Sequence, residues 1–147
     1  MSDETRILEV QIKDEFHFKF SHGGASRFFI ELSENRRFMG TRCPQCGHVW
    51  CPPRIICSRC LSSTEWVEVR DEGEVLCAVP IHMSLGLDLS HLGSPQVCAL
   101  IKLDGSDTCF KAIVAPKLGE TVQKGSRVRA VFKGTVQTIA DFSFELI

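Results

Sequence analysis

Hydrophobic and polar residues alternate with a period of two along most of the chain from residue 65 onward. The clearest example spans residues 96–115, where two alternating runs flank the turn sequence Asp104-Gly105-Ser106-Asp107, a pattern typical of a β-hairpin. Similar runs at 65–69, 74–83, 127–133 and 141–147 predict further strands, with a turn at 71–73. Five or six strands with one long insertion predict a small closed β-barrel.

An extended arm is expected near the start of the chain. Residues 16–20 alternate cleanly and place three phenylalanines on one face, namely Phe16, Phe18 and Phe20. Either the chain's own helix or a partner protein must cover this face, and the pattern leaves both interpretations open.

Residues 25–37 have the helical period instead. Phe28, Phe29 and Leu32 would share the apolar side of this helix, and Phe38 would extend it. Gly40 is expected to end the helix.

The insertion at residues 82–95 is too long for a tight turn and has Gly and Pro near its ends. Its leucines alternate with other residues and include Leu85, Leu87 and Leu89. Leucines on a loop favour contact with a partner, although a lid over the open end of the barrel fits the pattern equally well.

Four of the eight cysteines form two Cys-x-x-Cys pairs, 43/46 and 57/60, separated by ten residues. This spacing lets two short turns fold toward each other and present four sulfurs to one ion. Gly47 follows the first pair and can take the positive φ of a tight turn. Four cysteine ligands leave no open coordination position, so we predict a structural Zn²⁺ held by Cys43, Cys46, Cys57 and Cys60.

Other roles for the thiols fit less well. A thioredoxin-like redox site needs one such pair, usually in a βαβ context. Disulfides need an oxidising compartment, and no hydrophobic leader follows Met1, so we expect a cytoplasmic protein. His48 and Cys51 could each substitute for a ligand, but neither completes a pair, and we interpret both as packing residues or neighbours of the ligands. The four cysteines outside the two pairs are expected to be buried free thiols: Cys51, Cys77, Cys98 and Cys109.

Composition narrows the possible functions. With 44% hydrophobic and 24% charged residues in 147, the chain suits one compact domain beside a small module, and no apolar run approaches a membrane span. Residues 36–70 carry six arginines and two glutamates, a formal +4, but a tetrathiolate zinc centre contributes about −2. The basic surplus is therefore small, and we expect no nucleic-acid partner.

Together these patterns predict a mainly β chain with a short N-terminal helix, in which a rubredoxin-like zinc ribbon is followed by an OB-fold β-barrel. We expect the arm and helix at 1–40, the ribbon at 41–64 and the barrel at 65–147.

The order of motifs resembles a known family of small zinc-ribbon/OB-fold proteins that accompany thiolases and related condensing enzymes. From about residue 23 onward the chain contains Phe28-Phe29-Ile-Glu31-Leu32, Arg42-Cys43-x-x-Cys46-Gly47, Pro52-Pro53-Arg54, Cys57-x-x-Cys60, Trp66-Val-Glu68 and Val97-Cys-Ala99-Leu-Ile-Lys-Leu103. The chain departs from the family pattern at Cys51, where a less reactive residue is usual, and after Cys60, where Leu61 stands in place of glycine.

The resemblance implies a non-catalytic subunit of a hetero-oligomer that bridges a thiolase-like enzyme and a condensing-enzyme-like partner, or helps to hold an acyl donor near them. The size of the chain and its long arm are further similar to the small subunits of bacterial acyltransferase complexes that C-acetylate phloroglucinol-type polyketides in antibiotic biosynthesis. The arm and the leucine insertion are the expected partner surfaces.

Two other functions stay open. OB barrels also bind single-stranded nucleic acid by stacking bases on aromatic rings, but this chain has no Tyr and its barrel half is net acidic. An accessory acyl-CoA-binding protein would use arginines against the phosphates, with Arg42, Arg54 and Arg59 as candidates.

Catalysis by the chain itself would need a nucleophilic cysteine and a histidine base. The candidates are Cys77, Cys98 or Cys109 with His82 or His91. No oxyanion-hole signature or glycine-rich nucleophile turn accompanies these thiols, so we expect no catalytic residue here.

Overall fold

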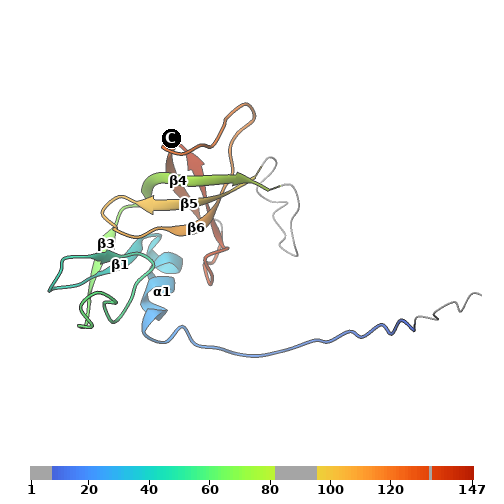
Figure 1. Cartoon of the computed structure of the whole chain (residues 1–147), viewed down its shortest axis with the longest axis horizontal. Coiled ribbons are helices and arrows are strands. Elements are labelled where there is room, and N and C mark those ends of the chain that lie inside the picture. The colour runs from blue at the N-terminus through green and yellow to red at the C-terminus, as the bar shows by residue number, and fades with distance from the viewer. Residues whose placement is uncertain (1–7, 82–95, 133) are drawn as a thin grey trace, which may run out of the picture.

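The computed structural model describes residues 8–81, 96–132 and 134–147. In these residues a short 3₁₀ turn and one α-helix precede eight strands (Figure 1). The elements are η1 (Gly23–Ala25), α1 (Ser26–Asn35), β1 (Phe38–Arg42), β2 (Val49–Trp50), β3 (Glu65–Val69), β4 (Glu72–Pro80), β5 (Val97–Leu103), β6 (Phe110–Val114), β7 (Arg127–Phe132) and β8 (Phe142–Leu146). No helix in the described part of the chain is long and apolar enough to cross a membrane.

The helix is shorter than the sequence pattern predicts. It buries Phe28 and Leu32 and ends where Arg36 takes a left-handed conformation with φ 54°. Phe38 lies in β1, and Gly40 lies inside that strand and does not end the helix. A Cβ at Gly40 would stand 2.7 Å from the carbonyl oxygen of Trp50. Glycine is therefore needed at position 40 because β1 and β2 approach closely there.

The first sheet belongs to the zinc ribbon and has the strand order β2-β1-β3. Strands β1 and β3 pair antiparallel from Phe38 opposite Val69 to Arg42 opposite Glu65. The sheet therefore includes residues on both sides of the expected boundaries at 40 and 64, and the division into three parts stays a prediction.

The second sheet is a closed barrel with the order β4-β5-β6-β8-β7, and β4 pairs with β7 to complete it. All neighbours are antiparallel except β6 and β8, which pair at Val114 and Phe144. This five-stranded barrel after a zinc ribbon confirms the predicted fold class. The predicted turn at residues 71–73 was wrong, because Glu72 and Gly73 begin β4.

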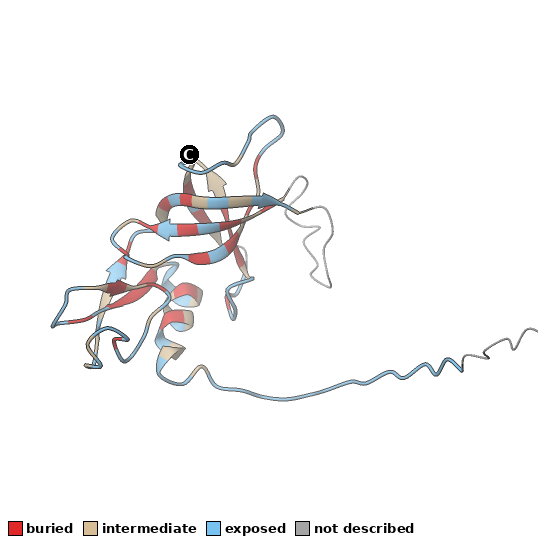
Figure 2. Cartoon of the chain, in the orientation of Figure 1, coloured by how far each residue is buried: buried red, intermediate tan, exposed pale blue. Residues whose placement is uncertain are grey.

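The barrel interior follows the alternation that the sequence predicts. Along β5, every second residue from Val97 to Leu103 is buried, while Leu100 and Lys102 face outward. Figure 2 shows the same alternation of buried and exposed residues along the barrel strands.

Phe38 joins the helix, the ribbon and the barrel in one hydrophobic core. Its ring is fully buried and lies 6.2 Å from that of Phe28 in α1, and 5.7 Å and 5.3 Å from those of Phe132 and Phe142 in the barrel. Ring pairs at these separations add to the stabilisation from burial. The ribbon and the barrel are therefore packed as one body.

Hydrogen bonds also join the ribbon to the turn between β5 and β6. The Val49 amide donates to Asp107 Oδ2 at 2.9 Å, and the Asp107 amide donates to the Val49 carbonyl at 2.9 Å. The Cys51 amide donates to Thr108 Oγ1, and that hydroxyl donates to the Cys51 carbonyl, both at 2.8 Å. This turn therefore fixes the edge of the ribbon sheet against the barrel.

Candidate metal centre and partner surfaces

The structure brings together the four cysteines of the two Cys-x-x-Cys pairs. Their Sγ atoms all lie within 4.8 Å of one another, and those of Cys46 and Cys57 are 3.8 Å apart. Four sulfurs about 2.3 Å from one Zn²⁺ would be separated by about 3.8 Å at the corners of a tetrahedron. The cluster therefore fits a structural zinc ion.

Each pair lies in a turn with the same hydrogen-bond pattern. In the first, Cys43 donates to the His48 carbonyl and accepts from the Gly47 amide, both at 2.9 Å. In the second, Cys57 donates to the Ser62 carbonyl at 2.9 Å and accepts from the Leu61 amide at 2.8 Å. We call these turns the Gly47 knuckle (residues 43–48) and the Leu61 knuckle (residues 55–64).

The electrostatics of the cluster favour a cation. A hydrogen bond with the Ser62 hydroxyl at 3.3 Å, together with backbone amides, lowers the pKa of the Cys43 thiol to about 6. The hydrogen bond with Cys46, burial and the neighbouring thiolates raise the pKa of Cys60 to about 12. Four negative sulfurs repel one another unless an ion compensates them, and zinc binding releases the remaining protons.

His48 and Cys51 lie outside the cluster of four sulfurs. Cys51 is fully buried in the hydrophobic core, and this burial raises the pKa of its thiol to about 12. The Nδ1 atom of His48 lies 3.1 Å from the Arg59 guanidinium, and its ring packs against Trp50.

The expectation of buried thiols was correct for Cys51 and wrong for Cys77 and Cys109, which are exposed, while Cys98 is half-buried. The register of β4 against β5 shifts between Val75 and Cys77, so the alternation that would bury Cys77 is broken there. Within the described residues, no hydrogen bond joins any of these three thiols to a histidine, and both candidate bases, His82 and His91, lie outside those residues.

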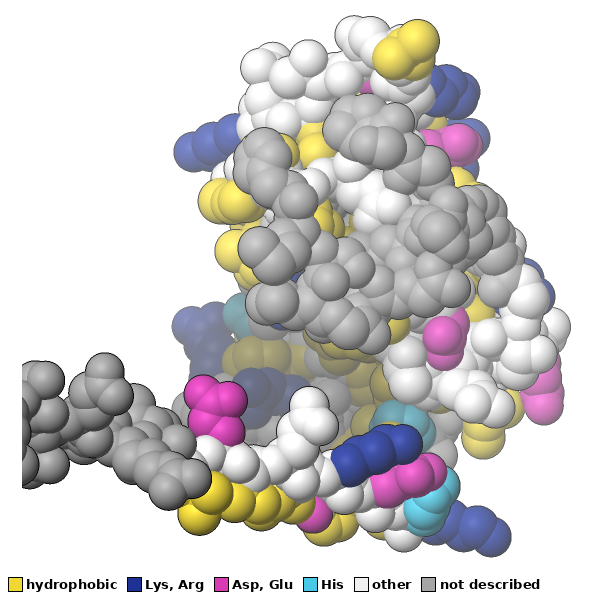
Figure 3. Space-filling view, turned by 90° about the vertical axis from the view of Figure 1, so that its right-hand side faces the viewer, with side chains coloured by type: hydrophobic (Ala, Val, Ile, Leu, Met, Phe, Trp, Pro, Cys, Tyr) yellow, Lys and Arg dark blue, Asp and Glu magenta, His cyan; other side chains and the backbone are white. Residues whose placement is uncertain are grey.

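The arm is extended, and its apolar face is exposed. Phe16, Phe18 and Phe20 are 81%, 78% and 67% exposed, so the helix does not cover them. Leu8, Val10 and Ile12 are also exposed and stand at even positions, in phase with the phenylalanines. Sequence reasoning missed this longer face, although the alternation of residues 8–12 signals it. Figure 3 shows the hydrophobic side chains in a row along the arm.

The second expected partner surface, formed by Leu85, Leu87 and Leu89, lies outside the described residues.

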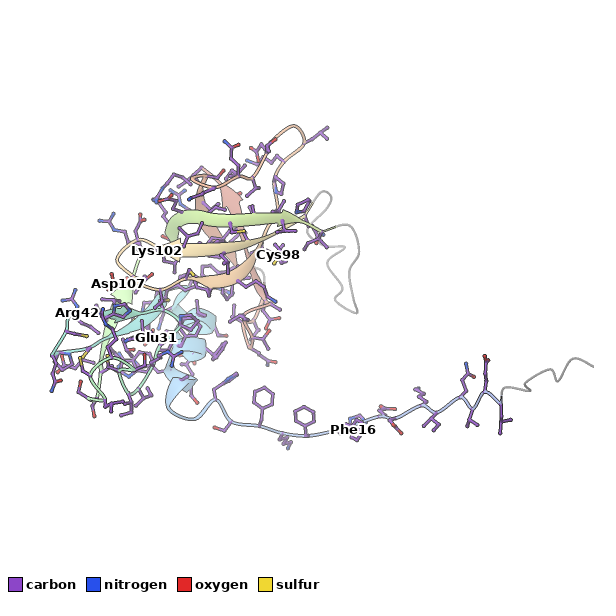
Figure 4. The ribbon with its side chains drawn as sticks, in the orientation of Figure 1. Phe16, Glu31, Arg42, Cys98, Lys102 and Asp107 are labelled. Atoms are coloured by element: carbon purple, nitrogen blue, oxygen red, sulfur yellow. The ribbon has the colours of Figure 1, made fainter. Side chains whose placement is uncertain are left out.

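A groove of about 520 Å³ lies where the ribbon meets the barrel. Arg42 and Lys102 line it beside Glu74, Asp104 and Asp107, and Figure 4 shows the labelled Arg42, Lys102 and Asp107 near one another. Of the three candidate arginines, only Arg42 lines this groove. Arg54 lies over the Trp50 ring at 5.0 Å, and Arg59 contacts His48, so these two arginines lie outside the groove.

A four-cysteine ribbon packed against a five-stranded barrel defines a class of two-module zinc proteins. The profile of the ChsH2 rubredoxin-like zinc ribbon domain matches residues 34–67. A DUF35 domain-containing scaffold protein of Methanocaldococcus jannaschii is 32% identical over 109 residues, which cover 73% of this chain and 75% of that protein. The chain belongs to the DUF35 family.

Solved structures show the same fold. The Ltp2-ChsH2(DUF35) aldolase matches with a TM-score of 0.65 at 20% identity, covering 87% of this chain and 98% of the matched chain. A DUF35-family protein of unknown function from Sulfolobus solfataricus matches with a TM-score of 0.63 at 21% identity, and the match covers 85% of this chain and 87% of the matched chain.

Proposed function

We propose that this chain is a zinc-binding scaffold subunit of a thiolase-like acyltransferase complex. It bridges the catalytic thiolase-like subunit and a condensing-enzyme-like subunit. The archaeal relative is described as a scaffold protein, and the ChsH2 (DUF35) structure is that of an aldolase containing Ltp2. The main observation in favour is the exposed apolar face of the arm, because a row of phenylalanines more than two-thirds exposed needs a partner to cover it.

Two surfaces are proposed to contact the partners. The first is the arm face with Phe16, Phe18 and Phe20. Its alternating side chains suit an extended segment that adds to a partner's sheet or lies in an apolar groove. The second comprises Leu85, Leu87 and Leu89 in the long insertion. The four clustered cysteines hold the ribbon in shape, and catalytic residues come from another subunit.

The reaction served by the complex is proposed to be C-acetylation of a phloroglucinol-type polyketide. The size of the chain and its long exposed arm support this assignment. We further propose a cytoplasmic location, because four zinc-binding thiolates persist in a reducing compartment.

The experiment is to purify the tagged chain from its native host and measure the mass and metal content of the intact complex. We expect one zinc per chain together with a thiolase-like and a condensing-enzyme-like subunit, and acetylation of monoacetylphloroglucinol only by the assembled complex. The matched variant replaces Phe16, Phe18 and Phe20 with serine, and it should fold normally and fail to recruit a partner. Acyl transfer by the purified chain alone would contradict the proposal, as would tight, salt-sensitive binding of single-stranded DNA.

A second candidate, accessory binding of acyl-CoA, is favoured by the groove between ribbon and barrel. Neither Arg42 nor Lys102 has an ion-pair partner among the described residues, and both line this space. Coenzyme A alone should then bind the wild-type chain, and the double change Arg42→Ala and Lys102→Ala should weaken binding at least tenfold. Equal affinity of the double variant would exclude this groove as the site.

A further inference from the structure

The two zinc knuckles share their hydrogen bonds but differ in the residue that follows the second cysteine. In the Gly47 knuckle this residue is a glycine with φ 71°, a left-handed conformation that glycine adopts freely. In the Leu61 knuckle it is a leucine with φ 57°. Side chains with a Cβ are disfavoured in this region, because the Cβ approaches the following carbonyl oxygen. The chain itself therefore shows that glycine satisfies this turn, yet it carries leucine at one of the two positions.

Packing within the chain does not explain the leucine. The Leu61 side chain is 80% exposed and is absent from the hydrophobic core that unites helix, ribbon and barrel. Its burial therefore adds little to the stability of the folded chain. An unfavourable backbone conformation without a packing gain is typical of functional positions.

Two more apolar side chains are exposed on the same hairpin. Ile55 and Ile56 are 43% and 51% exposed. A bridge between Ile56 and Ser63, and a hydrogen bond from the Thr64 amide to the Ile55 carbonyl at 3.0 Å, hold the strands of the hairpin together. The Leu61 knuckle thus carries an exposed leucine at its tip and partly exposed isoleucines on its first strand, and the cysteine cluster holds this turn in shape.

The charges around this surface indicate what it binds. Arg54 stacks on Trp50, and Arg59 contacts His48. Neither arginine has a carboxylate partner among the described residues. Although the zinc thiolates offset part of this charge, an apolar projection flanked by two arginines without carboxylate partners is complementary to an apolar pocket bordered by carboxylates.

We propose that Leu61 is an anchor residue that inserts into an apolar, carboxylate-bordered pocket of the thiolase-like partner. The inference rests on the proposed function and adds to it a specific contact on the ribbon, separate from the arm. The leucine is retained at a conformational cost because it contributes to the complex and not to the fold of the free chain.

The test is the variant Leu61→Gly, measured both in the free chain and in the complex. In the free chain we expect unchanged zinc content and an unchanged or higher thermal midpoint, because glycine relieves the left-handed conformation. The affinity for the thiolase-like enzyme that copurifies with the wild-type chain should fall at least tenfold, since a buried anchor is lost. Leu118→Gly is the control, because Leu118 is 96% exposed on the barrel and should have no effect on affinity.

A second variant tests the proposed charge complementarity between the arginines of the ribbon and the carboxylates of the partner's pocket. Arg59→Gln should weaken binding and reduce its dependence on salt, because one ion pair with the pocket border is removed.

The outcomes separate the two proposals. If the wild-type chain binds no thiolase-like enzyme, the proposed function fails, and this inference fails with it. If wild-type and Leu61→Gly chains bind that enzyme with affinities within twofold, only the anchor role is overturned. A lower thermal midpoint of the free Leu61→Gly chain would show that the leucine supports the fold itself. A wild-type homodimer that dissociates in this variant would assign Leu61 to a second copy of the chain, and it too would overturn the inference.

Discussion

Phenylalanines are used in opposite ways in two regions of this molecule. In the folded body, Phe38 and Phe144 are fully buried and share one aromatic cluster. In the arm, Phe16 and Phe18 are about four-fifths exposed, and Figure 4 shows the labelled Phe16 on a segment that extends away from the barrel. Both regions have alternating apolar residues. Alternation therefore predicts that a segment is extended and has an apolar face, but it does not reveal what covers that face.

Loss of the zinc site should have the largest effect on the folded body. Cys60→Ser removes one of the four clustered sulfurs, and a structural zinc contributes about 10 kcal/mol or more to folding. Because the ribbon and the barrel share a core, the variant should lose zinc and unfold at much lower temperature as a whole. Metal analysis and thermal unfolding test this.

The control for the zinc variant is Cys109→Ser, which changes an exposed thiol outside the cluster and should retain both zinc and stability. Stoichiometric zinc in Cys60→Ser would show that the ligand assignment is incorrect.

The contrast between buried and exposed phenylalanines can be tested by comparing the stability of the Phe38→Ala and Phe18→Ala variants. The first leaves a cavity at the junction of helix, ribbon and barrel and should lower the free energy of unfolding by about 3–5 kcal/mol. The second removes an exposed ring and should change it by less than about 0.5 kcal/mol. Denaturant unfolding of both chains gives the comparison, and equal losses would mean that the arm packs on the body in solution.

Removing a hydrogen bond at the junction of ribbon and barrel should lower the stability of the fold by a smaller amount. Thr108→Val removes the hydroxyl that bonds both the amide and the carbonyl of Cys51, and it leaves these backbone groups without that partner. We expect a loss of about 1–3 kcal/mol in the free energy of unfolding, again measured with denaturant. The exposed Thr121→Val is the matched control, and a Thr108→Val chain as stable as this control would contradict the role of the junction.

The smallest effect is expected at the surface of the helix. Arg37 donates to Glu31 at 2.7 Å, and with Asn35 it lowers the pKa of Glu31 from its usual value of 4.5 to about 2. This pair therefore stabilises the fold fully above pH 4.5, and its contribution is lost as the pH falls toward 2.

The thermal midpoint of the wild-type chain should fall between about pH 5 and pH 3 as Glu31 begins to take up a proton. Glu31→Gln should show a smaller fall over the same pH range, because its amide does not titrate. The exposed Glu34→Gln on the same helix is the control. An identical pH profile for wild type and Glu31→Gln would exclude the pair as a source of acid sensitivity.

The barrel and the cysteine cluster could be predicted from sequence because local signals determine them. Alternation along residues 97–103 fixes which side chains face the interior, and the two Cys-x-x-Cys spacings fix which thiols meet. The zinc ribbon and the barrel were both confirmed on this basis.

Features that depend on distant contacts could not be predicted. Gly40 has the local signature of a helix end, but its neighbours Trp50 and Val69 come from other strands. The outward position of Cys77 depends on a register shift between β4 and β5, which no pattern within β4 reveals. The union of ribbon and barrel through Phe38 is equally invisible in a local window, because its ring partners are up to about a hundred residues away.

The bonds between the β5–β6 turn and the edge of the ribbon have a mechanical consequence. Asp107 and Thr108 hydrogen-bond the chain on both sides of Trp50, so a rotation of the ribbon relative to the barrel would have to break these bonds. If the chain bridges two enzymes as we propose, a protein bound to the zinc knuckles would keep a constant orientation relative to one bound to the barrel.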